Sequence, residues 1–333
     1  MIYLPADWLH FRAESLATKF ERGRGTGYID EAIDLDRKAL EHCPPSHHMQ
    51  SDSLTSLAIH LSSHYSQLGV MEDIEEAIVL GQEALELCLQ GHPDRSQSLN
   101  NLAIDLSSQY KQFGAMEDLN EAIVVGREAL GLSPQGHPDR SGALNNLAFD
   151  LSSRYKQLRE MEDLTEAIVL DWEVLALCPQ GHPDRSISLN NLAVNLSSQY
   201  KQLGATEDLD EAIVLDREAL GLHQQGHPDR SMSLNNLAGR LFSCYRQLGA
   251  MEDHDEAIVL GQEALSLCPE GHPDRSMLLN NLAVYLFSQY NQLGVMEDLN
   301  EAIILGRKAL GLCPQGHPNR SVSLNNLAVN LSS

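Results

Sequence analysis

Apolar residues recur along this chain at helical spacing in two kinds of segment. In residues 186–204, Leu189, Leu196 and Leu203 lie within one arc at about 100° per residue. Gly204 follows them, and a glycine at that place supplies the left-handed turn that ends many helices. The pattern predicts an amphipathic helix over these residues.

The next segment, residues 207–222, predicts a second amphipathic helix. It opens with acidic residues, which the helix dipole favours in a first turn, and continues with Leu209 and Ala212 at helical spacing. Period-two alternation is absent, so no strand is predicted. Most copies of the first segment end in glycine, but Arg24 and Arg159 replace it, and there we expect a less sharply ended turn.

These two segments form a unit that repeats every 45 residues. The string GHPDRS or GHPNRS begins at Gly91, Gly136, Gly181, Gly226, Gly271 and Gly316. A worn copy begins at Ser46, and the helical pattern extends the register back to the N-terminus. The sequence therefore predicts a divergent repeat over residues 1–45, six repeats over 46–320 and an incomplete eighth repeat over 321–333.

A single helix pair cannot bury its own apolar face, whereas stacked pairs can. We therefore predict an all-α fold, a right-handed α-solenoid of helix-turn-helix repeats with a 45-residue period. The last segment exposes Leu324 and Leu331 where solenoids usually carry a polar cap, so we expect self-association through this end or a further segment beyond it. Trp8 and Phe11 give the first repeat its own sequence, as expected of a native end.

The repeats resemble the tetratricopeptide repeat. The strings LNNLA, EAIVL and EAL with a following proline carry the likeness, and the HPD link is similar to the kinesin-light-chain type. In the fifth repeat, Leu192 and Ala193 match the family's Leu-Gly/Ala pair, and Ala212 and Ala219 match its two close-packing alanines. The 45-residue form is similar to arrays of large fungal proteins that precede a CHAT (caspase-like) or nucleotide-binding domain.

This resemblance implies a non-catalytic protein–protein interaction scaffold that binds an extended peptide or a partner helix in its concave groove. The alternative is the sensor or oligomerisation arm of a larger signalling protein whose effector domain is absent from this chain. One departure from the family concerns a slot of the second helix that often holds a large aromatic residue. Here the slot holds Asp36, Gly81, Gly126, Asp171, Asp216, Gly261 and Gly306, so we expect different packing.

In such families the first helices line the groove, and this chain places one asparagine per repeat on that side. The ladder consists of Asn101, Asn146, Asn191, Asn236, Asn281 and Asn326. An amide both donates and accepts hydrogen bonds, so the ladder could hold the backbone of a peptide. It could equally join adjacent repeats by hydrogen bonds, and the sequence leaves both readings open.

Partner choice would come from positions on the same side that differ between repeats. These are Asp105, Asp150, Asn195, Arg240 and Tyr285, together with sequence neighbours such as Ile104 and Phe149. The partner is predicted to be a protein or peptide. Nucleic acid is excluded by a net charge of −24, which would repel phosphates.

Several further functions lack support in the sequence. No apolar run reaches membrane-spanning length and no basic segment precedes an apolar one, so we expect neither a membrane anchor nor a signal peptide, and a cytoplasmic location. No glycine-rich phosphate loop, GxSxG elbow or HExxH motif occurs, so we predict no enzymatic activity and no cofactor. Five cysteines recur in one repeat slot and are predicted to be buried free thiols: Cys43, Cys88, Cys178, Cys268 and Cys313.

Each loop between repeats carries a histidine and an arginine. Metal sites need clustered ligands, so we interpret the histidines as lone helix caps and predict no metal site. The histidines are His92, His137, His182, His227, His272 and His317. The arginines are predicted to form solvated or inter-repeat ion pairs: Arg95, Arg140, Arg185, Arg230, Arg275 and Arg320.

Overall fold

The computed structural model describes residues 6–23, 25–42, 50–88, 91–92, 94–317 and 319–332. These residues form fifteen α-helices, and no strand occurs among them. In chain order the helices are α1 Ala6–Glu21, α2 Gly27–Glu41, α3 Gln50–Leu68, α4 Met71–Leu87, α5 Arg95–Phe113, α6 Met116–Leu132, α7 Arg140–Leu158, α8 Met161–Leu177, α9 Arg185–Leu203, α10 Thr206–Leu222, α11 Arg230–Leu248, α12 Met251–Leu267, α13 Arg275–Leu293, α14 Met296–Gly311 and α15 Arg320–Leu331. Odd-numbered helices are the first helices of the repeats and even-numbered helices are the second.

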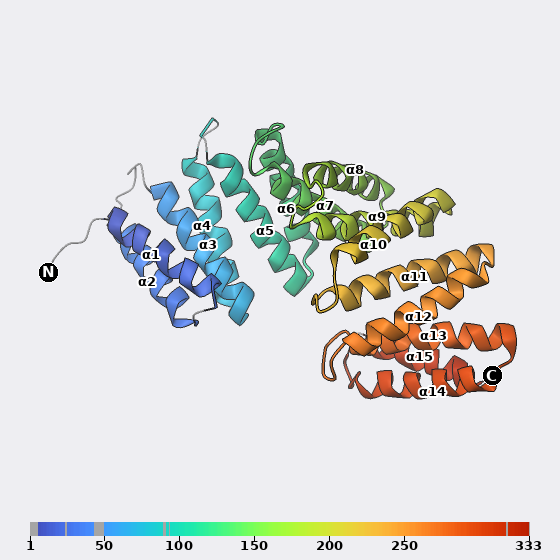
Figure 1. The fold of residues 1–333 in the computed structure, drawn as a ribbon. Coiled ribbons are helices and arrows are strands. Elements are labelled where there is room, and N and C mark those ends of the chain that lie inside the picture. The colour runs from blue at the N-terminus through green and yellow to red at the C-terminus, as the bar shows by residue number, and fades with distance from the viewer. Residues whose placement is uncertain are drawn as a thin grey trace. The chain divides into compact units, whose positions relative to one another are not determined.

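The chain divides into two compact units, residues 1–174 and 175–333. In each unit the two helices of a repeat pack against each other, and each second helix packs against the first helix of the next repeat (Figure 1). This is the helix-pair stacking of an α-solenoid, as the 45-residue period predicts. The predicted helix over 186–204 is α9, and the predicted helix over 207–222 is α10. No described helix combines the length and apolar character that crossing a membrane requires.

Most first helices end at a residue in the left-handed conformation. Gly114 and Gly204 have φ values of 73° and 72°, and each N–H bonds to a tyrosine carbonyl four residues earlier at 2.7 Å. The expectation of a looser turn at Arg159 is wrong, because that residue adopts the same conformation with φ 62° and bonds to Tyr155 O at 2.8 Å. The left-handed conformation costs a non-glycine residue about 1 kcal/mol. Arg24 lies outside the described residues.

Glycine in the slot of the second helix lets the first helix of the next repeat pack closely against it. A Cβ atom placed on Gly126 would lie 3.6 Å from Leu147 Cδ1, and one placed on Gly306 would lie 3.3 Å from Leu327 Cδ1. A large aromatic residue has no room at this distance, so the departure from the family's usual residue is a packing requirement. The first helix lies against the bare helix backbone at these positions.

At two of the aspartate slots, Asp36 and Asp216, a basic side chain from the next repeat faces the carboxylate. In the first unit, Asp36 Oδ2 lies 2.5 Å from His60 Nδ1, and both residues are buried. In the second unit, Asp216 Oδ2 lies 2.6 Å from Arg240 Nη1, again between buried residues. A buried carboxylate without a partner would be strongly destabilising, so the two positions depend on each other.

The loop arginines connect three helix ends. Arg140 Nη1 donates to Ser133 O at the end of α6 at 2.6 Å, and Arg140 Nε donates to Glu173 Oε1 of α8 at 2.6 Å. Arg185 makes the equivalent bonds to Cys178 O and Glu218 in the second unit. These side chains are only 16 % exposed, so they are structural parts of the stack rather than solvated charges.

The cysteine prediction is confirmed for every member within the described residues. Cys88, Cys178, Cys268 and Cys313 are buried free thiols, each just after a second helix. Cys43 lies outside the described residues.

The glycine slot gives the first testable prediction. Gly126→Leu should lower the free energy of unfolding by about 1–3 kcal/mol, because the new side chain must displace Leu147. Gly131→Leu in the same helix is the control, since Gly131 is exposed with no atom within 4 Å of its Cβ position, and its stability should stay equal or rise slightly. Thermal unfolding followed by circular dichroism measures both, and equal midpoints for the two variants would contradict the packing requirement.

Candidate functional site

Two adjoining cavities lie on the first helices of the first unit. One, of about 270 Å³, lies between α3 and α5, and its lining includes Tyr65, Asn101 and Ile104. The other, of about 190 Å³, lies between α5 and α7, and its lining includes Ile104, Asn146 and Phe149. Ile104 borders both cavities, so they adjoin on α5 and together extend over three consecutive first helices. We call the two cavities together the first-helix groove.

The rim of the first-helix groove is apolar with one cation. Ile104 is 40 % exposed and Phe149 is 41 % exposed, although both are large apolar side chains. Lys111 Nζ lies 4.2 Å from the centroid of the Phe149 ring, at the distance of a cation–π interaction. The rim therefore offers apolar contact surface beside a positive charge.

The floor of the first-helix groove is acidic and buried. Asp105 is 4 % exposed and Asp150 is 2 % exposed. Asp105 accepts a short hydrogen bond from Ser62 Oγ, and Asp150 accepts one from Ser107 Oγ at 2.6 Å. Burial raises the pKa of Asp105 to about 7 against the opposing effect of the Ser62 bond. It raises the pKa of Asp150 to about 6, opposed by Ser107 and by the charge of Lys111.

In the second unit the positions equivalent to Asp105 and Asp150 are buried as well. Asn195, Arg240 and Tyr285 are between 4 % and 6 % exposed. Arg240 is bound to Asp216, and the Tyr285 ring lies 3.5 Å from the Cβ position of Gly261. The sequence predicted these residues as groove surface, and the structure places them between helices, because this face of the first helix meets the preceding repeat.

The asparagine ladder is half-buried and runs between repeats. Three members donate from Nδ2 to an asparagine 46 residues earlier: Asn146 to Asn100 at 3.1 Å, Asn236 to Asn190 at 2.7 Å and Asn281 to Asn235 at 2.9 Å. Asn191 and Asn326 are also half-buried. These bonds match the inter-repeat reading that the sequence left open.

Asn101 differs from those three members of the ladder. The residue 46 positions earlier is Thr55 instead of asparagine, and Asn101 Nδ2 is buried without a hydrogen-bond partner. Asn101 also lines the larger cavity of the first-helix groove. An unsatisfied buried amide is costly, so this amide group has a hydrogen-bonding capacity that the packing of the repeats leaves unused.

The predicted capping role of the loop histidines is confirmed at each of the six. Each ring Nδ1 accepts the N–H of the residue two positions later, which precedes the first helix, at 3.1–3.3 Å. The interpretation as lone histidines is wrong at His227, because His223 stacks on it with ring centroids 4.2 Å apart. His223 stands in the slot that cysteine holds in most repeats, and that substitution in a single repeat was the available signal.

The family model of the tetratricopeptide repeat matches residues 95–139, 187–229, 230–274 and 276–319, which together make up more than half of the chain. The chain belongs to the tetratricopeptide repeat family. Tetratricopeptide repeat proteins generally mediate protein–protein interactions, and their fold is typically non-catalytic.

Solved tetratricopeptide repeat structures share parts of this arrangement. The C-terminal part of a TPR repeat-containing protein from Cytophaga hutchinsonii has 13 % sequence identity and a TM-score of 0.56, over 97 % of this chain and 99 % of that chain. Kinesin light chain nearly identical TPR-like repeats from Podosopora anserina have 21 % identity and a TM-score of 0.47, over 66 % of this chain and 98 % of that one. YrrB, a TPR protein with an unusual peptide-binding site, has 15 % identity and a TM-score of 0.44, over 74 % of this chain and 96 % of that chain. No curated protein matches the chain.

The raised pKa of Asp105 predicts a pH dependence for this tetratricopeptide repeat array. The folded state holds the proton up to about pH 7 while the unfolded pKa is 3.8, so this group makes stability fall as pH rises between those values. Asp105→Asn removes that loss of stability. The free energy of unfolding of this variant should exceed that of the original chain by about 1–3 kcal/mol at pH 8 and should equal it at pH 3. Asparagine occupies the equivalent position naturally as Asn195.

The control is Glu86→Gln, which removes one negative charge at an exposed position. Thermal midpoints of both variants between pH 3 and pH 8 test the prediction. Equal midpoints for Asp105→Asn and Glu86→Gln at pH 8 would show that burial of Asp105 costs nothing.

Proposed function

We propose that this chain is a non-catalytic scaffold that binds an extended peptide in the first-helix groove. The observation that carries the proposal is that two cavities adjoin at Ile104 and together extend over α3, α5 and α7. An extended peptide places successive side chains on opposite sides, so alternate residues would meet Ile104 and Phe149. The exposure of these two apolar side chains gives a bound peptide surface to bury.

The peptide backbone would be held by amides at the edge of the floor. Asn101 Nδ2 is buried without a partner, and rotation of this side chain toward the larger cavity would let it donate to a peptide carbonyl. Asn146 donates to Asn100, so its remaining contribution to the peptide would come through its carbonyl oxygen. We therefore expect Asn101 to contribute mainly to peptide binding and Asn146 to contribute to stability as well.

The net charge of the chain favours a peptide with basic residues. At −24 the protein attracts cationic segments over long range, which raises association rates and disfavours acidic partners. The peptide that fits best carries apolar residues at alternate positions and a net positive charge. We propose the cytoplasm as its location, where the free thiols of the cysteine slot would stay reduced.

Asn101→Ala, compared with Asn146→Ala, tests this function. Linear peptides selected from a random display library on the full chain serve as the probes, and fluorescence anisotropy measures their affinity. We expect Asn101→Ala to weaken binding about tenfold with an unchanged thermal midpoint, and Asn146→Ala to lower the midpoint as well, because it breaks the bond to Asn100.

Phe149→Ala should also weaken binding, while Asn300→Ala on the exposed side of α14 is the matched control and should leave affinity unchanged. Selected peptides that bind Asn101→Ala and Phe149→Ala as tightly as the original chain would refute binding in this groove. A helical circular dichroism spectrum of the bound peptide would identify a partner helix instead of an extended peptide.

A further inference from the structure

The fifth repeat carries a histidine where most other repeats carry a buried cysteine. His223 directly follows α10, and its side chain is buried with the residue only 6 % exposed. Its Nδ1 lies 2.7 Å from Ser233 Oγ, so this nitrogen is occupied by a hydrogen bond to α11. The other ring nitrogen, Nε2, is buried and has no hydrogen-bond partner.

Two further ligand-type side chains lie next to His223. His227 stacks on its ring with an interplanar angle of 16°, and Asp229 Oδ2 is 3.9 Å from His227 Nδ1. One potential ligand atom from each of His223, His227 and Asp229 lies within 4.8 Å of the others. Within the part of the chain that the structure describes, no other group of three histidine, cysteine or acidic residues meets this spacing.

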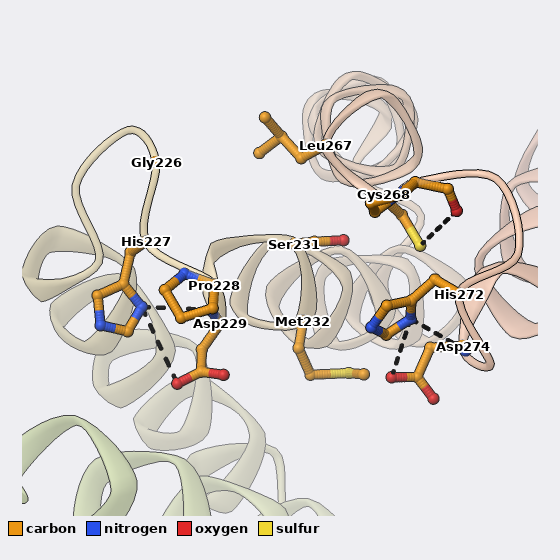
Figure 2. A pocket seen from close by; sticks show the side chains of 11 residues that line it. Gly226, His227, Pro228, Asp229, Ser231, Met232, Leu267, Cys268, His272 and Asp274 are labelled. Carbon is orange, nitrogen blue, oxygen red and sulfur yellow. Dashed lines mark hydrogen bonds and ion pairs between the residues drawn. The ribbon is translucent and has the colours of Figure 1, made fainter. Parts of the chain in front are cut away.

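An open cavity of about 510 Å³ adjoins this cluster (Figure 2). His227 and Asp229 line one side, and the next loop contributes His272 and Asp274, with Met232 between the two loops. Three protein ligands leave coordination positions for water or an external donor, and the cavity has room for them. His227 and Asp229 are therefore open to solvent through this cavity, whereas His223 is buried and does not line it.

We propose that His223, His227 and Asp229 bind a divalent transition-metal ion such as Zn²⁺ or Ni²⁺. Imidazole nitrogens with one carboxylate oxygen suit these ions, whereas Ca²⁺ and Mg²⁺ require oxygen ligands. The metal would satisfy the unpartnered Nε2 of His223, and the Ser233 bond at Nδ1 orients the ring for that contact.

The electrostatics of His223 agree with a ligand role. Burial, together with the neighbouring His227, lowers the pKa of His223, so the ring is neutral at neutral pH as a metal ligand must be. His227 Nδ1 accepts a hydrogen bond from Asp229 N at 3.2 Å. If His227 binds the metal through Nδ1, it loses this bond, and if it binds through Nε2, the metal must replace the proton on that nitrogen. The metal therefore competes with the capping bond, which favours moderate affinity.

Metal titration of the untagged full chain tests the proposal. After removal of metals by a chelator, isothermal titration with ZnCl₂ and NiCl₂ should show one ion bound per chain. His223→Ser should weaken this binding about tenfold or more, since it removes one of three ligands. Serine is native in the same slot as Ser133, where it is buried and bonded to Ala129 O, so the variant is expected to fold.

The matched control is His137→Ala, which removes a loop histidine whose slot residue is Ser133 and should leave binding unchanged. His227→Gln keeps a hydrogen-bond acceptor at the cap and tests the same site should His223→Ser fail to fold. Zn²⁺ should also raise the thermal midpoint of the original chain but not that of His223→Ser. Equal affinity of the original chain and both His223→Ser and His227→Gln would overturn the proposal.

Discussion

The close approach of each first helix to the second helix before it governs the geometry of each unit. The second helix lacks a side chain at this contact at Gly126 and Gly306, and at Asp36 and Asp216 it carries a carboxylate with a basic partner. The loop arginines then hold the helix ends in place around the contact. Because each helix contacts only its neighbours in the stack, the same contact is repeated with local variations. The groove on the first helices follows from this spacing.

The first-helix groove combines two roles in one layer of side chains. Its buried floor belongs to the helix packing, through Asp105 and Asp150 and their serine partners. Its rim, with Ile104 and Phe149, is exposed and is available for contact with a ligand. Evolution can therefore change the rim with little effect on the stack, whereas changes in the floor alter stability first.

The helices and their repeat were predictable from the sequence because the period is strict and each copy supports the others. The burial of Asp105, Arg240 and Tyr285 was not, because it depends on how far each first helix rotates toward its neighbour. A single-helix pattern does not fix that rotation for a polar residue. The His223 cluster does not follow from the loop histidines alone, because it depends on the slot residue four positions before His227. Arg159 shows that a tertiary contact can impose a conformation that the residue itself disfavours.

Nearly identical repeats carry a hazard of misassembly, since any second helix could in principle dock on any first helix of the same chain or of another copy. The paired slots oppose such errors. Asp216 in contact with Asp105 in place of Arg240 would bury two carboxylates together, and Tyr285 in contact with Asp36 would leave no room for its ring. A wrong neighbour at these particular interfaces would therefore be disfavoured. Such differences between otherwise similar repeats favour one order of stacking and oppose domain swapping.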